Sequence, residues 1–366
     1  MTLTSTGEDA YFAASNSAKG FFSYYAECFD DARIQRVFAI KGGPGTGKSY
    51  FMRSVAAYAQ ARRWECEFIY CSSDPRSLDG IILSRGDSCI ALLDATAPHV
   101  YEPRMPGVRE EIVDLGAFWD AERLAEHAKE IEAWNQKKQS AYKSAYRYLS
   151  AYGTMMENRD ALVAPYIRLD DMETYAEKLF WEIPCGKSFS FRHALMRSVG
   201  MDGLVGFDTY FAQARRIFLV EDCRGSAQYF MRMLYHLAER KRLRVRVSHD
   251  PILPERIDGL FLCECGYAFA VGKTTECPYS YKRIGTRRFV DVSSMKAIKA
   301  PINHAEQMCR AMLGGTVEAM KRVREAHFHL ETLYISSMDF AAKEKFTKDF
   351  CQKLFPLQSG ENCDTI

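Results

Sequence analysis

The chain has 366 residues, of which 47% are hydrophobic and 26% are charged. This composition is typical of a folded globular protein and excludes a disordered chain, a collagen-like repeat and a small disulfide-stapled protein. The 49 Lys and Arg residues nearly balance the 47 Asp and Glu residues, so the net charge of +2 gives no whole-molecule reason to expect a polyanionic partner. One hydrophobic core seldom exceeds about 250 to 300 residues, and the length therefore predicts two domains.

The N-terminal segment and the cysteines indicate the cellular compartment that we expect for the protein. Residues 1–9 lack the basic and apolar regions of a secretory signal, and the twelve cysteines show no paired spacing. We therefore expect reduced thiols and a cytoplasmic protein. No apolar run approaches the roughly 18 to 20 residues of a membrane helix, so we expect no membrane span.

The first strongly patterned segment is a strand, a glycine cluster and a helix in succession. Val37–Lys41 is a short apolar run typical of a buried strand, and residues 48–63 carry apolar side chains at helical spacing. Between them the phosphate-binding loop pattern is matched in full, in the strand-loop-helix setting that it requires. The matching residues are Gly42, Gly43, Pro44, Gly45, Thr46, Gly47, Lys48 and Ser49.

The chemistry of this segment predicts a bound polyphosphate. Its glycines let backbone N–H groups turn inward, and the following helix adds its positive N-terminal end. Lys48 would reach the β and γ phosphates, Ser49 would give its hydroxyl to a magnesium ion, and Tyr50 would complete the nucleotide-binding segment. We therefore predict ATP and Mg²⁺ as cofactors, with ATP preferred because neither half contains the Asn-Lys-x-Asp motif of guanine sites.

Two further short apolar runs, Glu67–Cys71 and Cys89–Leu93, are typical of buried parallel strands and lead into acidic residues. Asp94 directly follows the second run, where nucleotide sites place their metal carboxylate, so we predict it as a magnesium ligand and catalytic residue; a turn cap is the alternative. Asp74 follows the first run and is predicted as a catalytic residue that acts as base or holds an acceptor. Ordinary turn chemistry is the alternative for Asp74.

Other polar residues near these strands are weaker candidates. Many P-loop ATPases place a glutamate directly after the metal carboxylate, but this chain has Ala95 there, so fast hydrolysis is not implied. Asp79 and His99 are further candidates for a base, with turn or cap roles as the alternative. Arg104 and Arg109 are candidates for stabilising a transferring phosphoryl group, with solvated surface roles as the alternative.

Residues 122–155 lack proline and predict a long helix or helix pair, after which the whole pattern recurs. Five collinear matches at offsets of 176 to 180 indicate a duplicated unit of about 180 residues. The matches are Arg36–Ile40 with Arg216–Val220, Tyr50–Arg53 with Tyr229–Arg232, Asp74–Pro75 with Asp250–Pro251, Leu78–Leu83 with Ile257–Leu262, and Val113–Leu115 with Val290–Val292. A second helical region is predicted over residues 304–351.

The second copy has lost the residues that would hold a nucleotide. Its loop, Glu221–Gln228, has one glycine, no lysine and two acidic residues, which would repel a triphosphate. The position equivalent to Asp94 falls near Gly272 or Lys273. The basic stretch Arg240–Arg246 is a candidate for binding an anionic partner such as nucleic acid, with a solvated helix end and strand edge as the alternative.

The glycine loop, Cys71-Ser-Ser-Asp-Pro75, Leu78-Asp-Gly80 and Asp94-Ala-Thr-Ala-Pro-His99 together carry a resemblance over nearly the whole chain. With these motifs the chain resembles a family of poorly characterised bacterial P-loop ATPases built from two tandem P-loop units. The resemblance implies ATP binding at the glycine loop, while the altered second loop departs from a two-site pattern. We expect two tandem P-loop NTPase-like three-layer α/β domains with mainly parallel sheets, each followed by long helices. The domains are predicted at 1–183, with the intact loop, and 184–366, with the degenerate one.

The leading hypothesis is therefore a magnesium-dependent ATP-binding P-loop NTPase. It would hydrolyse ATP slowly or transfer a phosphoryl group to a small acceptor, and the sequence does not separate these two reactions. The alternative is a nucleotide-dependent switch whose degenerate second domain docks a protein or nucleic-acid partner. The missing glutamate and the altered second loop both suit that alternative.

Overall fold

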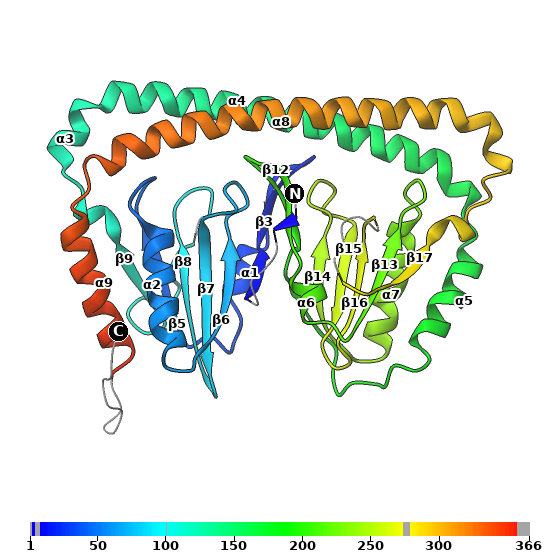
Figure 1. The fold of residues 1–366 in the computed structure, drawn as a ribbon, viewed down its shortest axis with the longest axis horizontal. Helices are drawn as coiled ribbons and strands as arrows, with labels where there is room; N and C mark the ends of the chain where they lie inside the picture. The colour runs from blue at the N-terminus through cyan, green and yellow to red at the C-terminus, as the bar shows by residue number, and fades with distance from the viewer. Residues whose placement is uncertain (1, 4–7, 100, 274–278, 357–366) are drawn as a thin grey trace. The chain divides into compact units, whose positions relative to one another are not determined.

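The computed structural model describes residues 2–3, 8–99, 101–273 and 279–356 (Figure 1). The fold is α/β, with two mixed sheets of mostly parallel strands and long helices, arranged as two repeated units. Within the described ranges, no helix combines the length and the apolar character that a membrane span requires.

The predicted duplication is confirmed by the order of the elements. The first copy contains β5 (Arg36–Lys41), α2 (Lys48–Gln60), β6 (Glu65–Tyr70), β7 (Leu78–Arg85), β8 (Ser88–Asp94), β9 (Glu110–Asp114), the 3₁₀ helix η1 (Leu115–Phe118), α3 (Ala121–Glu126), α4 (Ala128–Val163), η2 (Ala164–Tyr166) and α5 (Leu169–Phe180). The second contains β13 (Arg216–Glu221), α7 (Ala227–Arg240), β14 (Arg244–His249), β15 (Ile257–Leu262), β16 (Tyr267–Val271), β17 (Lys282–Gly285), η4 (Thr286–Phe289), η5 (Ser294–Ile298), α8 (Lys299–Ile335) and α9 (Phe340–Leu354).

The remaining elements precede each copy. Before the first copy come β1 (Thr2–Leu3), β2 (Asp9–Phe12), β3 (Ala14–Ser17), β4 (Gly20–Ser23) and α1 (Tyr25–Phe29). Before the second copy come β10 (Ser190–His193), β11 (Arg197–Gly200), β12 (Gly203–Phe207) and α6 (Thr209–Ala212).

Corresponding strands are neighbours in the same order in both sheets. The strand order is β6-β7-β8-β5-β9 in the first copy and β14-β15-β16-β13-β17 in the second. The central strand of each copy is parallel to both neighbours, β5 to β8 and β9, and β13 to β16 and β17. The carboxyl ends of these parallel strands therefore meet at one edge, where open α/β sheets bind their ligands.

The expectation of mainly parallel sheets is confirmed, although both sheets are mixed: β7 runs antiparallel to β8. Only Gly86 and Asp87 separate these two strands, and Gly86 has a φ of 59°. A two-residue turn with glycine first joins antiparallel strands, whereas a parallel connection needs a crossover of a dozen or more residues. β14, β15 and β16 are likewise antiparallel in succession.

The compact units are interleaved in the sequence. One comprises residues 1–28, 70–75 and 139–323, and the other comprises 29–69, 76–138 and 324–366. Each predicted half, 1–183 and 184–366, therefore contributes to both compact units. Within their units, α5 packs against α7 and α9 packs against α2. The final helix of each copy thus completes the core of a unit whose central sheet comes from the other copy.

Aromatic side chains fix α9 on α2. The ring of Phe51 lies 5.1 Å from that of Phe350 and 6.1 Å from that of Phe346, measured between centroids. Phe51 is completely buried. This packing holds the start of α9 beside the start of α2, which directly follows the glycine loop (Figure 1).

Candidate functional site

The Gly42–Ser49 loop connects β5 to α2 as the sequence predicts. Gly42, Gly45 and Gly47 have φ angles of 146°, 72° and 75°, a region that side-chain-bearing residues rarely adopt. Gly47 is the residue that caps α2, and no side chain caps this helix end. The first N–H groups of a helix have no partners within it, so they are donors for an external anion.

Lys48 and Asp94 meet at the edge where β5 and β8 end. Asp94 is the last residue of β8 and pairs with Ile40 of β5. The Lys48 Nζ lies 3.4 Å from Asp94 Oδ2, with the two side chains only 13% and 12% exposed. Lys48 also donates to the carbonyls of Gly42 and Gly43, at 2.8 and 3.0 Å. The predicted lysine and the predicted metal carboxylate are therefore adjacent.

A second buried pair adjoins this one. His99 Nε2 lies 2.9 Å from Asp79 Oδ2, and both side chains are less than a tenth exposed. Burial alone would lower the pKa of His99, but the hydrogen bond and charge of Asp79 outweigh it and raise that pKa. For Asp94, burial raises the pKa of the carboxyl, Lys48 opposes this, and the charge of Asp79 adds to it. The four groups are thus electrostatically coupled.

Ser49, the other predicted magnesium ligand, lies in the first turn of α2. Its Oγ accepts a hydrogen bond from the backbone N–H of Leu78 at 3.0 Å. This contact ties the start of α2 to the start of β7. Ser49 and Asp94 supply a hydroxyl and a carboxylate oxygen, the donor types that magnesium prefers.

Trp119 is a residue of this site that sequence reasoning missed. A methyl group added to Gly43 would lie 3.2 Å from the Trp119 ring, so the indole lies directly against the loop. The Trp119 Nε1 is buried and has no hydrogen-bond partner among the described residues. A buried donor without an acceptor is costly, so this N–H favours an acceptor supplied by a ligand. No local motif marks Trp119, because its position depends on how the chain returns after β9.

The other predicted residues have different surroundings. Tyr50 is 59% exposed on the first turn of α2. Asp74 is buried and belongs to the compact unit that does not contain the loop, so its predicted catalytic role remains a prediction. Arg109 donates to the carbonyls of Phe29 and Ile34, and these contacts give it a structural role.

Arg104, the other arginine considered for a phosphoryl group, is 74% exposed and pairs with Asp30 at 3.0 Å. The alternative of a solvated surface arginine therefore describes Arg104. Neither arginine is needed to explain the polar groups gathered at the glycine loop.

The corresponding loop of the second copy is closed by its own carboxylate. Asp222 accepts hydrogen bonds from the backbone N–H groups of Gly225 and Ala227, at 2.8 and 2.9 Å. These donors stand at the start of α7, where the first copy offers its own at the start of α2. Asp222, one of the two acidic residues that would repel a triphosphate, thus also accepts from the backbone donors that a triphosphate would need. The metal carboxylate is missing as predicted, although strand pairing places its counterpart at Val271 rather than at Gly272 or Lys273.

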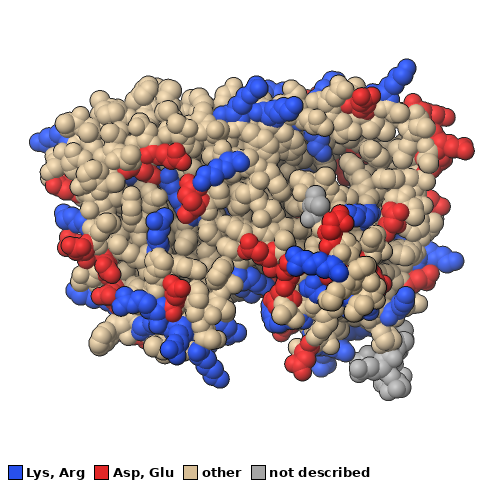
Figure 2. Space-filling model, turned by 180° about the vertical axis from the view of Figure 1, so that it is seen from behind, with Lys and Arg blue, Asp and Glu red and all other residues tan. Residues whose placement is uncertain are grey.

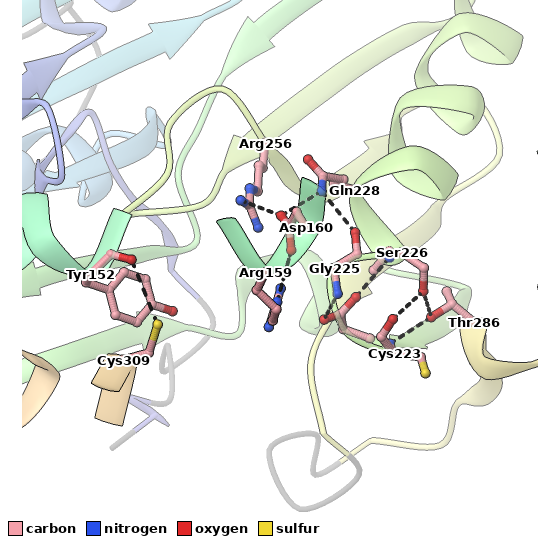
Figure 3. A network of polar contacts seen from close by, with 12 residues as sticks. Tyr152, Arg159, Asp160, Cys223, Gly225, Ser226, Gln228, Arg256, Thr286 and Cys309 are labelled. Atoms are coloured by element: carbon pink, nitrogen blue, oxygen red, sulfur yellow. Dashed lines mark hydrogen bonds and ion pairs between the residues drawn. The ribbon is translucent and has the colours of Figure 1, made fainter. Parts of the chain in front are cut away.

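A buried ionic network reinforces this closure (Figure 3). Asp160 of α4 accepts from Arg159, from Arg256 at 2.7 Å and from Gln228 at 2.9 Å. A methyl group on Gly225 would lie 2.2 Å from Asp160 Oδ1, so this carboxylate lies directly against the loop. The second loop therefore has protein groups where a ligand would have to enter.

The basic stretch Arg240–Arg246 is largely neutralised. Arg246 forms a two-armed pair with Asp9, each contact 2.7 Å long. Arg244 pairs with Glu264 at 3.0 Å and Arg240 with Glu177 at 3.5 Å. Figure 2 shows basic and acidic side chains interspersed on the face that it draws. These pairs count against a nucleic-acid surface. The alternative of a strand edge is also wrong, because β14 lies between β10 and β15.

Comparison with known proteins adds no functional assignment. No protein-family model matches the chain, and neither a curated protein nor a solved structure shows significant similarity to it. The functional conclusion therefore depends on the residues of the site.

Proposed function

We propose that the chain binds magnesium ATP at the Gly42–Ser49 loop and uses it for slow hydrolysis or for phosphoryl transfer to a small acceptor. The observation that carries this proposal is the 3.4 Å approach of Lys48 Nζ to Asp94 Oδ2 beside the uncapped start of α2. Nucleotide sites combine these elements: backbone donors, a lysine for the phosphates and a carboxylate for magnesium.

The residues present fit both groups. Gly47 leaves the start of α2 open to an anion, and the buried N–H of Trp119 supplies a donor that lacks an acceptor. Asp94 and Ser49 would hold magnesium, which when bound neutralises charge on the phosphates. The Lys48 side chain is only 13% exposed, so its amine has little water around it. On binding, this amine would exchange its contact with Asp94 for one with a phosphate oxygen.

The Asp79–His99 pair is our candidate for the base. A buried carboxylate that orients an imidazole is an arrangement suited to proton transfer near neutral pH. The charges of Asp94 and Lys48 act on this pair, which supports its role beside the proposed phosphate site. Because Ala95 cannot polarise water, slow turnover is expected unless an acceptor is present.

The first experiment is a calorimetric titration of magnesium ATP, ADP and GTP into wild type and Lys48→Ala, followed by a phosphate-release assay. Wild type is expected to bind ATP, and Lys48→Ala to lose most of this affinity, since a charged hydrogen bond contributes about 1.5–3 kcal/mol. Asp222→Asn is the matched control in the closed loop and is expected to bind as wild type does. If the wild-type protein binds no nucleotide, the proposal is wrong.

The reaction itself is tested with His99→Gln. If the histidine is the base, this variant keeps the wild-type affinity for magnesium ATP but releases phosphate more slowly, by about a hundredfold or more. Equal release rates in wild type and His99→Gln would remove the base assignment while leaving nucleotide binding intact.

A nucleotide-dependent switch is the second candidate, and two observations favour it. The residue after Asp94 is Ala95, and the second loop is closed by Asp222. A switch would show tight ATP binding with negligible phosphate release, and release would rise when a protein partner is added. Steady release by the purified chain favours the enzyme.

A further inference from the structure

Lys343 of α9 is a buried lysine whose surroundings the site described so far does not explain. The residue is only 3% exposed. Its Nζ lies 4.7 Å from the ring centroid of Tyr50 and 5.4 Å from that of Phe340. A methyl group placed on Gly47 would lie 2.6 Å from this Nζ, so the amine is directed at the residue that caps α2.

In the part of the chain that the structure describes, no carboxylate pairs directly with this amine. Among the described residues, Lys343 forms no hydrogen bond through Nζ and no ion pair with a carboxylate. Glu344, the acidic residue beside it, pairs with Lys348 instead. Burial lowers the pKa of the Lys343 amine, and the start of α2 presents a like charge through its helix dipole. A buried cation at the positive end of a helix is unfavourable unless an anion joins it.

The helix α5, which packs against α7 beside the closed loop, shows what this position becomes where no ligand is expected. Residues 168 and 339 cap α5 and α9, and the residues buried beneath the caps follow the same spacing in both helices. Those residues are Met172, Ala176 and Phe180 in α5, and Lys343, Thr347 and Cys351 in α9. The counterpart of Lys343 is therefore the completely buried Met172. Of these two matched positions, the one in the unit with the open glycine loop holds a lysine and the other holds a methionine.

We propose that Lys343 is a second cation for the nucleotide's polyphosphate, supplied by α9 to the loop between β5 and α2. This inference rests on the proposed function, because the anion that it requires is the triphosphate chain. Lys48 and Lys343 then approach the phosphates from α2 and α9. Binding of the triphosphate also fixes α9 against α2, since one anion contacts both helices.

The test is a titration of magnesium ATP and of tripolyphosphate into wild type and Lys343→Met. Methionine suits this position because Met172 occupies the equivalent position in α5. The dissociation constants for both ligands are expected to rise about ten- to a hundredfold, the effect of losing one charged hydrogen bond. The control is Lys345→Met, which removes an exposed lysine of the same helix and is expected to bind as wild type does.

A stability measurement separates ligand binding from a structural role. Without nucleotide, the urea midpoint of Lys343→Met is expected to equal or exceed that of wild type, because an unbalanced buried charge is removed. A lower midpoint with unchanged affinity would show that Lys343 only supports the fold. Lys343→Gln provides the same comparison if the methionine variant does not fold.

The outcomes distinguish the two proposals. Wild type that binds ATP, with Lys343→Met binding equally well, would overturn the role of Lys343 and leave the proposed function standing. Wild type that binds neither ATP nor tripolyphosphate would overturn both. Weaker binding in Lys343→Met alone, at an unreduced urea midpoint, is the result that we expect.

Discussion

Asp160 is the shared acceptor of two buried arginines, so its removal has a large expected cost. The carboxylate is 10% exposed, and its partners Arg159 and Arg256 are 8% and 11% exposed. Asp160→Ala leaves both guanidinium groups in a poorly hydrated site without their anion. Removing one partner of a buried ion pair typically costs about 3–5 kcal/mol, and we expect a loss in this range.

The assay is equilibrium unfolding in urea, followed by circular dichroism at constant pH. The midpoint is expected to fall while the slope stays constant, because the surface exposed on unfolding changes little. Glu318→Ala is the control: it removes an exposed pair with Lys321 and should cost less than about 0.5 kcal/mol. A loss below about 1 kcal/mol for Asp160→Ala would show that water reaches the network, and the Asp160 network would then not reinforce the closure made by Asp222.

Three further predictions concern the first loop. Asp79 raises the pKa of His99 in the folded protein above the value of about 6.5 in the unfolded chain. The protonated imidazole therefore stabilises the fold fully below about pH 6.5, and this stability is lost as the pH rises through the pKa of His99 in the folded protein. Urea midpoints measured from pH 6 to 9 should show that loss in wild type but not in Asp79→Asn. Asp94→Asn should abolish the dependence of ATP affinity on magnesium in calorimetry, and an unaltered dependence would exclude this carboxylate as the metal ligand. Gly47→Ala should lower the free energy of unfolding by about 1–2 kcal/mol, because the φ of Gly47 is 75° and the new methyl would meet Lys343. An unchanged urea midpoint would contradict that geometry.

Local patterns were sufficient to predict the strands and the loop. The apolar run before Gly42 forms β5, and the run before Asp94 forms β8. Both predictions depend on short segments whose burial follows from their composition. The same reasoning predicted that Lys48 and Asp94 lie at one edge of the sheet, because neighbouring parallel strands end at the same edge. The hairpin at Gly86 was missed, although a glycine-first two-residue turn is a local signal too.

Long-range packing was not predictable from local patterns. Lys343 reaches the loop because α9 of the second copy packs on α2 of the first, and Trp119 reaches it because the chain returns past β5 after β9. A lysine in an amphipathic helix is ordinarily a solvated residue, and nothing near Lys343 in the sequence distinguishes it from Lys345. The counterpart helix supplies the distinguishing information, because Met172 shows that the position belongs to the core.

The differences between the two copies have one physical explanation. Three charged residues of the first site have uncharged counterparts in the second, namely Ala227 for Lys48, Val271 for Asp94 and Met172 for Lys343. Each of these charged side chains is largely removed from solvent, and such a charge is tolerated when an opposite charge or a ligand balances it. If a site binds no anion, a buried lysine there is costly, and a buried aspartate is costly once the lysine that pairs with it is gone. Apolar replacement at all three positions removes that cost, and Asp222 then takes the helix donors left without a ligand. The charged set at the first loop, Lys343 included, is accordingly expected to persist only where an anion still binds.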